Sequence, residues 1–191
     1  MSILSKLLRR SDEYLIEQVK RGNNQAYLEI FERYQKGVYN FSLGYCRRSE
    51  IATEITQECF LKLFSKASSF DGNKAFRPWF WSLVRNQCHD WYRKEKGSSL
   101  LLEDSLASEQ SEGVLEDAPF LLLIQKIQQK RIWDIVQSLL PAERDALMLW
   151  LEELDYKEMA LVLNKSPDAV KGLLKRAKQR FAKLWQEGEE Q

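Results

Sequence analysis

Cations and aromatic rings are interleaved in the segment 76–96, FRPWFWSLVRNQCHDWYRKEK. At helical spacing this segment has two faces. One face is apolar and is predicted to pack into a core: Phe80, Leu83, Val84, Cys88 and Trp91. The other face carries Trp81, Arg85, His89, Tyr92 and Lys96. Because phosphates attract cations, and a ring stacks only on a base that has left the duplex, the second face is predicted to bind unpaired nucleic acid.

A second basic surface, of a different kind, is predicted near the C-terminus. Asp155 and Glu158 have the spacing of a capping box, which would begin a short helix that ends at about Leu163. After a turn, Ser166 and Pro167 are predicted to begin a last helix that runs to about residue 185. Two short helices joined by a tight turn form a helix-turn-helix, whose second helix can enter the major groove of DNA.

The turn and the last helix carry the candidate contacts of this module. Between residues 165 and 183 the chain has seven cations and one acid. An apolar face that includes Val170, Leu174 and Ala177 is predicted to point inward. The residues predicted to meet base edges and phosphates are Lys165, Ser166, Asp168, Lys171, Lys175, Arg176, Lys178 and Gln179.

The distribution of charge along the chain is more informative than its net charge of +1. Residues 1–96 hold 17 Lys+Arg and 11 Asp+Glu, a net of +6. Residues 97–119 hold no Lys or Arg and six Asp+Glu, a net of −6. Residues 120–191 hold 12 Lys+Arg and 11 Asp+Glu, a net of +1. The pattern indicates two basic surfaces joined by an acidic connector. Since the connector is also rich in serine, it is predicted to be a flexible linker.

The periodicity of apolar residues predicts an all-α protein. Long stretches have apolar residues at helical spacing, strand-like alternation is absent, and the 191 residues include only 8 Gly and 4 Pro. We expect two small helical domains, 1–96 and 120–191, joined by the flexible acidic linker 97–119. The C-terminal domain is expected to be a helix-turn-helix. A helix over about 50–66 and a loop over 68–74 should precede the aromatic and basic helix, with Pro78 in its first turn.

Several classes of site and location are disfavoured by composition. His89 is the only histidine, which excludes an HExxH motif or another multi-histidine metal site, and no glycine-rich phosphate loop occurs. We therefore predict no catalytic residues, no metal and no cofactor. The three cysteines are odd in number and lack a CxxC pair, which favours a reducing cytoplasm. The apolar run at the N-terminus is too short for a signal peptide or a membrane span.

Short motifs occur in a particular order along the chain: EITQECF at 54–60, FD at 70–71, FRPW at 76–79, NQCHDWYR at 86–93, LP at 140–141, YKEMA at 156–160, and VK at 170–171 with RA at 176–177. In order and spacing they resemble the extracytoplasmic-function sigma factors, the small two-domain specificity subunits of bacterial RNA polymerase. Gly172 and Leu173 depart from the pattern, since the family usually has Ser-Arg there.

The resemblance implies that the 50–66 helix binds the clamp of the polymerase. The implied contacts are Glu54, Gln57, Glu58 and Leu61. Three glutamates at 50, 54 and 58 share one helix face, where like charges repel by a few tenths of a kcal/mol per pair, roughly. A basic or donor-rich partner would offset this repulsion. A merely solvated acidic face is the alternative interpretation.

The resemblance also implies that the 69–74 loop and the helix after it capture a base flipped from the minus-ten element. The implied contacts are Asp71, Asn73, Lys74, Phe76, Arg77, Trp81, Arg85, Asn86, His89, Tyr92 and Arg93. For Asn86, a buried and internally satisfied amide is the alternative. The last helix of the chain would read the minus-thirty-five duplex.

The partners implied are core RNA polymerase, through its clamp and flap, promoter DNA, and an anti-sigma factor. The protein would be cytoplasmic, and at the nucleoid when in holoenzyme, without membrane insertion. The acidic linker would either thread the RNA exit path or act as a simple tether. A stand-alone helix-turn-helix transcriptional regulator is the alternative function, and a helical adaptor without a DNA role is a third.

Overall fold

The computed structural model describes residues 10–99 and 120–188, and over this part of the chain it contains helices and no strand. The elements are α2 (Asp12–Lys20), α3 (Asn24–Cys46), α4 (Ser49–Lys66), the 3-10 turn η1 (Ala67–Ser69), α5 (Phe76–Ser99), α6 (Phe120–Ser138), α7 (Pro141–Leu151), α8 (Tyr156–Leu163) and α9 (Pro167–Glu187). The predicted all-α class with a C-terminal helix-turn-helix, α8–α9, is confirmed.

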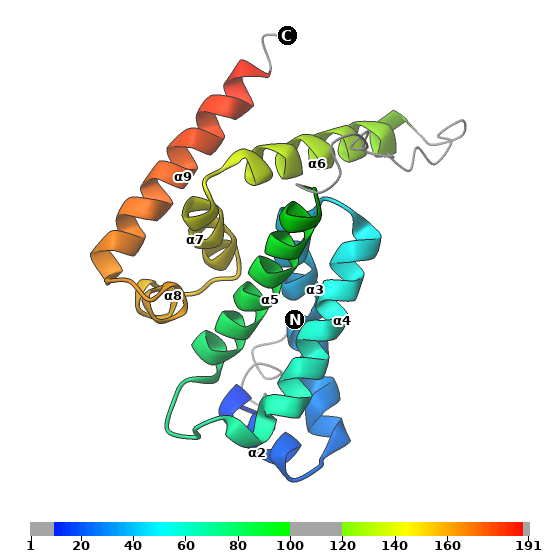
Figure 1. Ribbon diagram of the computed structural model, residues 1–191, viewed down its shortest axis with the longest axis vertical. Coiled ribbons are helices and arrows are strands. Elements are labelled where there is room, and N and C mark those ends of the chain that lie inside the picture. The colour runs from blue at the N-terminus through cyan, green and yellow to red at the C-terminus, as the bar shows by residue number, and fades with distance from the viewer. Residues whose placement is uncertain (1–9, 100–119, 189–191) are drawn as a thin grey trace.

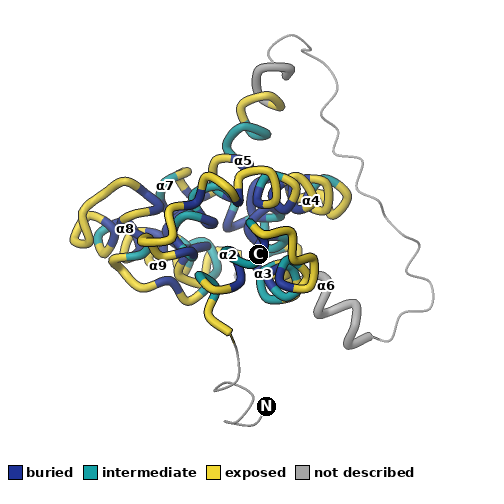
Figure 2. The backbone as a smooth tube through the Cα atoms, turned by 90° about the horizontal axis from the view of Figure 1, so that it is seen from below, coloured by how far each residue is buried: buried dark blue, intermediate teal, exposed yellow. Residues whose placement is uncertain are grey.

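Helices α2 to α5 pack around a core rich in aromatic rings. Phe41 from α3, Phe60 from α4 and Phe80 from α5 are buried there, and the Phe60 and Phe80 ring centroids are 5.7 Å apart. Rings supply large apolar area, so these side chains provide much of the contact that holds the four helices together. Buried positions, dark blue in Figure 2, lie where helices face one another.

Helices α7, α8 and α9 form a second cluster around Met148, Met159 and Leu174, all buried. Helix α6 contacts α3 and α9. Helix α5 lies in the middle of the molecule (Figure 1), where it contacts α2, α3 and α4 of the first cluster and also α8 of the second. The two clusters therefore meet along α5.

Local sequence explains where four of these helices begin. The side chains of Ser11, Asn23, Asp155 and Ser166 each accept hydrogen bonds from backbone N–H groups of the first turn. The predicted capping box of α8 is present in full, with Glu158 accepting in return from the Asp155 N–H. Such caps satisfy N–H groups that have no partner within the helix.

Replacing Asn23 by alanine is expected to lower the free energy of unfolding by about 1 kcal/mol. Its Oδ1 accepts from the N–H groups of Gln25 (3.0 Å) and Ala26 (3.2 Å), and alanine would leave both without this partner. Urea titration followed by circular dichroism would measure the loss. Asn23→Ser keeps an acceptor and serves as the control, and equal midpoints for the two variants would contradict the capping role.

The sequence predicts no disulfide framework, no membrane span and a linker that begins at residue 97. Cys46, Cys59 and Cys88 are buried and free. Within residues 10–99 and 120–188, no helix is long and apolar enough to span a membrane. Helix α5 continues to Ser99 and so includes the first three residues of the predicted linker. The rest of the predicted linker, 100–119, lies outside the described residues.

Candidate functional site

Two of the aromatic side chains predicted to contact DNA are instead part of the core. Phe76 and Trp81 are 0% and 1% exposed, and Trp81 packs against Phe41 of α3 with ring centroids 5.6 Å apart. This part of the prediction is wrong for the conformation described, because neither ring offers a face to a base. The physical reason is that α5 is surrounded by other helices, so more of its circumference is buried than the apolar face seen in the sequence.

The loop before α5 is exposed and ordered by its own polar side chains. Asp71 Oδ1 accepts from the backbone N–H of Asn73 (3.1 Å) and from its side-chain amide (3.2 Å). The backbone hydrogen bond to Asn73 is the main cause that holds the pKa of Asp71 below its usual value. Lys74 Nζ lies 3.9 Å from the same carboxylate and is itself exposed. The loop therefore presents its polar groups to solvent in a preformed turn.

Three of the predicted basic contacts on α5 face the second cluster. Arg85 Nε donates to Asp145 Oδ2 on α7 (2.6 Å). His89 Nε2 lies 3.1 Å from the same oxygen. Arg77 donates to Glu158 Oε2 of α8 (3.3 Å) and to the carbonyl of Glu152 (2.8 Å).

Asp145 is the centre of this group, and its side chain is 0% exposed. Burial alone would raise the pKa of Asp145, but the hydrogen bond from His89 and the charge of Arg85 together hold the pKa below its usual value. The hydroxyl of Tyr45 also donates to this carboxylate. A buried carboxylate is stable only with such partners, so Asp145 depends on residues of α3 and α5.

The remaining predicted contacts on α5 differ in exposure. Asn86 is exposed, which excludes the alternative of a buried amide. Arg93 is 76% exposed and pairs with Asp90 on the same helix. Tyr92 is half-buried, with its ring centroid 6.2 Å from that of Tyr45. Asn86 and Arg93 are thus available to a ligand, whereas Tyr92 is partly covered.

The predicted polymerase contacts on α4 lie together on one exposed face. Glu54, Gln57, Glu58 and Leu61 are all exposed, Leu61 by 67%. Sequence analysis missed Phe64, which is 53% exposed one turn after Leu61 and packs edge-on against Tyr27. Its position three residues after Leu61 was the available signal. Exposed apolar side chains with a polar rim are typical of a protein-binding surface.

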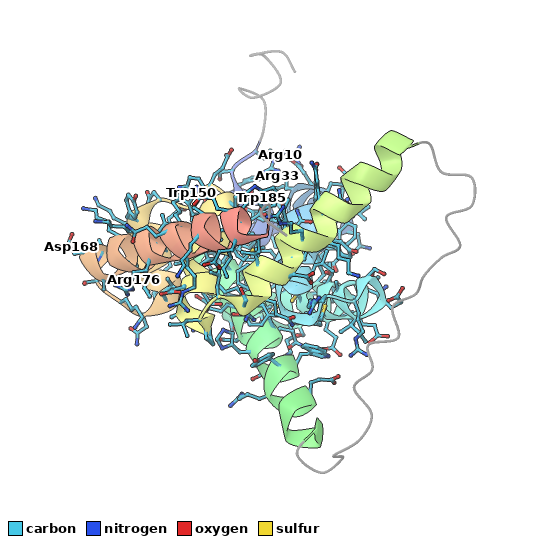
Figure 3. The ribbon with its side chains drawn as sticks, turned by 90° about the horizontal axis from the view of Figure 1, so that it is seen from above. Arg10, Arg33, Trp150, Asp168, Arg176 and Trp185 are labelled. Atoms are coloured by element: carbon cyan, nitrogen blue, oxygen red, sulfur yellow. The ribbon has the colours of Figure 1, made fainter. Side chains whose placement is uncertain are left out.

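The basic face of α9 is exposed as predicted, with Lys165, Ser166, Asp168, Lys171, Lys175, Arg176, Lys178 and Gln179 all accessible. Figure 3 shows Asp168 at the beginning of α9 and Arg176 along its side. Lys178 lies over the ring of Trp150, 3.4 Å from its centroid. Such contacts hold cations in place by charge–quadrupole attraction.

Sequence analysis missed two residues beside this face, Glu143 and Arg180. Glu143 of α7 is 3% exposed, and its carboxylate lies 3.6 Å from Arg176 Nε and 3.4 Å from Arg180 Nε. One buried acid thus orients two arginines that are one turn apart on α9. The spacing of Arg176 and Arg180 was visible in the sequence, whereas the position of Glu143 under them depends on how α7 packs.

Comparisons with known proteins agree with this arrangement. Residues 30–98 match the family model of Sigma-70 region 2, and residues 129–181 match that of Sigma-70, region 4. The ECF RNA polymerase sigma factor SigM of Bacillus subtilis (strain 168) is 31% identical over 162 residues, which is 84% of this chain and 95% of the relative. SigW of the same strain is 28% identical over 179 residues, covering 88% of this chain and 93% of the relative.

Two solved structures have a similar fold. CnrH in complex with the cytosolic domain of CnrY has a TM-score of 0.71 and 18% identity, and the match covers 93% of this chain and 98% of that one. RpoE in complex with the anti-sigma factor NepR from Bartonella quintana has a TM-score of 0.63 and 16% identity, with 84% and 96% covered. At these identities the likeness concerns the fold alone.

Proposed function

The chain belongs to the extracytoplasmic-function (ECF) sigma factors, and we propose which of its surfaces meets each partner in transcription initiation. As a sigma factor it acts with bacterial RNA polymerase. The observation that carries the assignment of surfaces is the separation of one acidic and apolar face, on α4, from one basic face, on α9. Opposite charges on two modules suit a protein partner on one side and DNA on the other.

The clamp of core RNA polymerase is the proposed partner of α4. Leu61 and Phe64 supply exposed apolar area, and the carboxylates of Glu54 and Glu58 flank them. Buried apolar anchors with a charged rim are how protein interfaces combine affinity with specificity. A basic surface on the clamp would also remove the repulsion between the glutamates of α4.

The minus-ten element is the proposed ligand of the 69–74 loop and α5. With Phe76 and Trp81 in the core, the proposed contacts are those on the loop and the polar side of the helix: Asp71, Asn73, Lys74, Arg77, Arg85, Asn86, His89, Tyr92 and Arg93. The loop is preformed and exposed, which suits the capture of a base that has left the stack.

The minus-thirty-five duplex is the proposed ligand of α9. Its exposed cations suit phosphates, and Gln179 can read a base edge. Arg176 is positioned by Glu143. The residues 97–119 are proposed to connect the two DNA-binding modules, either through the RNA exit path or as a tether.

Further partners follow from the family. CnrH and RpoE are bound to the cytosolic domain of CnrY and to the anti-sigma factor NepR, and we expect an inhibitor of this kind here. The polymerase flap is the proposed partner of the C-terminal domain. We expect no catalytic activity from the chain itself, and action in the cytoplasm at the nucleoid, where the polymerase works. A stand-alone helix-turn-helix regulator is not favoured, because it leaves the region 2 match over residues 30–98 without a role.

Run-off transcription would test this function. Purified chain is added to core RNA polymerase on a pool of genomic promoter fragments, and we expect a defined subset of fragments to yield transcripts that core alone does not produce. Sequencing the transcript ends locates the promoters. Absence of chain-dependent transcripts, with the chain shown to be folded by circular dichroism, would contradict the proposal.

A further inference from the structure

One face of α2 lies against the loop that joins η1 to α5 (Figure 1). We propose that three side chains of this face, Glu13, Glu17 and Lys20, are positioning residues that hold the minus-ten capture loop in its binding shape without touching DNA. They are spaced four and three residues apart, so they share one side of the helix. This inference rests on the proposed role of the 69–74 loop, and it gives α2 a part in base recognition.

The loop leaves the core and returns to it at two phenylalanines whose rings are in contact. Phe70 and Phe76 are 3% and 0% exposed, and their ring centroids are 6.0 Å apart. The residues between them, 71–75, are all exposed. Because both ends of the loop are anchored at neighbouring points of the core, its shape depends on the backbone directions at these two ends.

Lys20 fixes the backbone at the first end of the loop. Its Nζ donates to the carbonyl oxygen of Phe70 (2.7 Å) and lies 5.4 Å from the centroid of the Phe70 ring. The Lys20 ammonium is itself held by Glu17, whose Oε1 is 2.6 Å from Nζ. Hydrogen bonds from a charged donor are stronger than those between neutral groups. Lys20 therefore sets the orientation of the peptide group from which the loop begins.

Glu13 fixes the backbone at the second end of the loop and also caps α5. The residue before α5 is Ala75, which has no side-chain oxygen to accept from the first turn of the helix. Glu13 Oε1 takes this place by accepting from the backbone N–H of Phe76 (3.1 Å). A carboxylate at the beginning of a helix is also favoured by the helix dipole. The direction in which the chain enters α5 thus depends on a residue of α2.

Glu17 lies against the middle of the loop. A Cβ added to Gly72 would come within 2.9 Å of Glu17 Oε1, so the carboxylate approaches the Gly72 backbone more closely than it could approach a residue with a side chain. On either side of Gly72, Asp71 and Asn73 are joined by their own hydrogen bonds and remain exposed. The loop is therefore supported by α2 at its start, its middle and its end.

A loop that is ordered before binding can discriminate between bases. Hydrogen bonds to a base edge depend on direction, so Asp71 and Asn73 can distinguish one base from another only while the loop backbone keeps its shape. The cations on α5 and α9 that attract phosphates do not depend on this shape. Loss of the α2 contacts is therefore expected to reduce the preference for the captured base more than the general affinity for DNA.

Single substitutions on α2 separate these contacts. Glu13→Ala and Lys20→Met each remove one of them. Glu13→Gln keeps an oxygen that can accept from the Phe76 N–H, and Lys20→Arg keeps a cationic donor, so these two are the conservative variants. Tyr14→Ala is the control on the same helix, since Tyr14 is 46% exposed and lies about 100° around the helix from Glu13. Asn73→Ala, within the loop, reports the role of the loop itself.

Holoenzyme formed with each variant is titrated with a labelled promoter fragment that the run-off assay identifies. The fragment has a duplex minus-thirty-five element and a single-stranded non-template minus-ten strand, whose bases are replaced one at a time. The base preference at a position is the ratio of the affinities for the original and the replaced strand. We expect Glu13→Ala and Lys20→Met to lower this ratio about fivefold at the captured base. The conservative variants and Tyr14→Ala should keep the wild-type ratio.

The outcomes separate this inference from the proposed function. A general loss of stability would lower the affinity for every fragment alike and would leave the ratio unchanged. Wild-type ratios for Glu13→Ala and Lys20→Met, with a lowered ratio for Asn73→Ala, would overturn the positioning role of α2 alone. Wild-type ratios for all three would also overturn the minus-ten role of the loop.

Two further results would contradict the inference. A ratio lowered to the same extent by Tyr14→Ala would assign the effect to α2 as a whole and not to the three side chains. If Lys20→Met made the slope of log affinity against log salt concentration shallower by about 0.7 at an unchanged ratio, Lys20 would be a phosphate contact and not a positioning residue.

Discussion

Replacing Leu61 by aspartate is expected to weaken binding of the chain to core RNA polymerase about 100-fold. Leu61 is 67% exposed at the centre of the α4 face, between the glutamates and Phe64. An apolar side chain in that place gains free energy only when a partner buries it, whereas an aspartate there would lose this apolar contact and would add a like charge beside Glu58. The effect is therefore both lost contact and added repulsion.

The measurement is surface plasmon resonance with immobilised core enzyme. Tyr14→Asp is the matched control, since Tyr14 is 46% exposed in the same domain but on α2, and it should leave the affinity within about threefold. The pair Gln57→Ala and Glu58→Lys should also weaken binding. Wild-type affinity for Leu61→Asp and for this pair would show that the clamp does not bind α4.

Replacing Lys175 and Arg176 together by alanine is expected to weaken binding to a cognate promoter fragment by about 30-fold. Both side chains are exposed on α9, and Figure 3 shows Arg176 along the side of this helix. If each cation neutralises one phosphate, the slope of log affinity against log salt concentration should become shallower by about 0.9 per contact, or about 1.8 in all.

The fragment is one that the run-off assay identifies, and affinity is measured with holoenzyme at several salt concentrations. Lys183→Ala is the control, because Lys183 is 76% exposed on the same helix but pairs with Glu187 near its end. If the salt-dependence slope of the double variant is unchanged, the minus-thirty-five contacts do not lie on this face of α9. A shallower slope with unchanged sequence preference would assign both side chains to phosphates and not to bases.

The acidic face of α4 and the basic face of α9 could be predicted because both depend on local rules. Ser166 and Pro167 begin α9 as expected, and the exposed cations follow from a period of 3.6 residues. On a helix packed on one side only, periodicity is enough to separate the buried face from the exposed one.

On helix α5, periodicity does not separate the buried side chains from the exposed ones. Trp81 is one turn before Arg85, so periodicity places both on one face, yet the first is buried against Phe41 and the second is bonded to Asp145, 60 residues later in the chain. Asp145 itself had no recognisable role in the sequence, since a carboxylate within an apolar helix gives no indication of what it will meet.

The sequence by itself determined which segments are helical, where their caps lie, and which surfaces carry charge, because these follow from hydrogen bonds and contacts within a few residues. Only the tertiary structure decided that α7 and α8 cover the cations of α5 and that Phe76 belongs to the core. The physical reason is that the burial of a helix facing two neighbours depends on how separate domains pack, and this packing is not encoded in the period of a single helix.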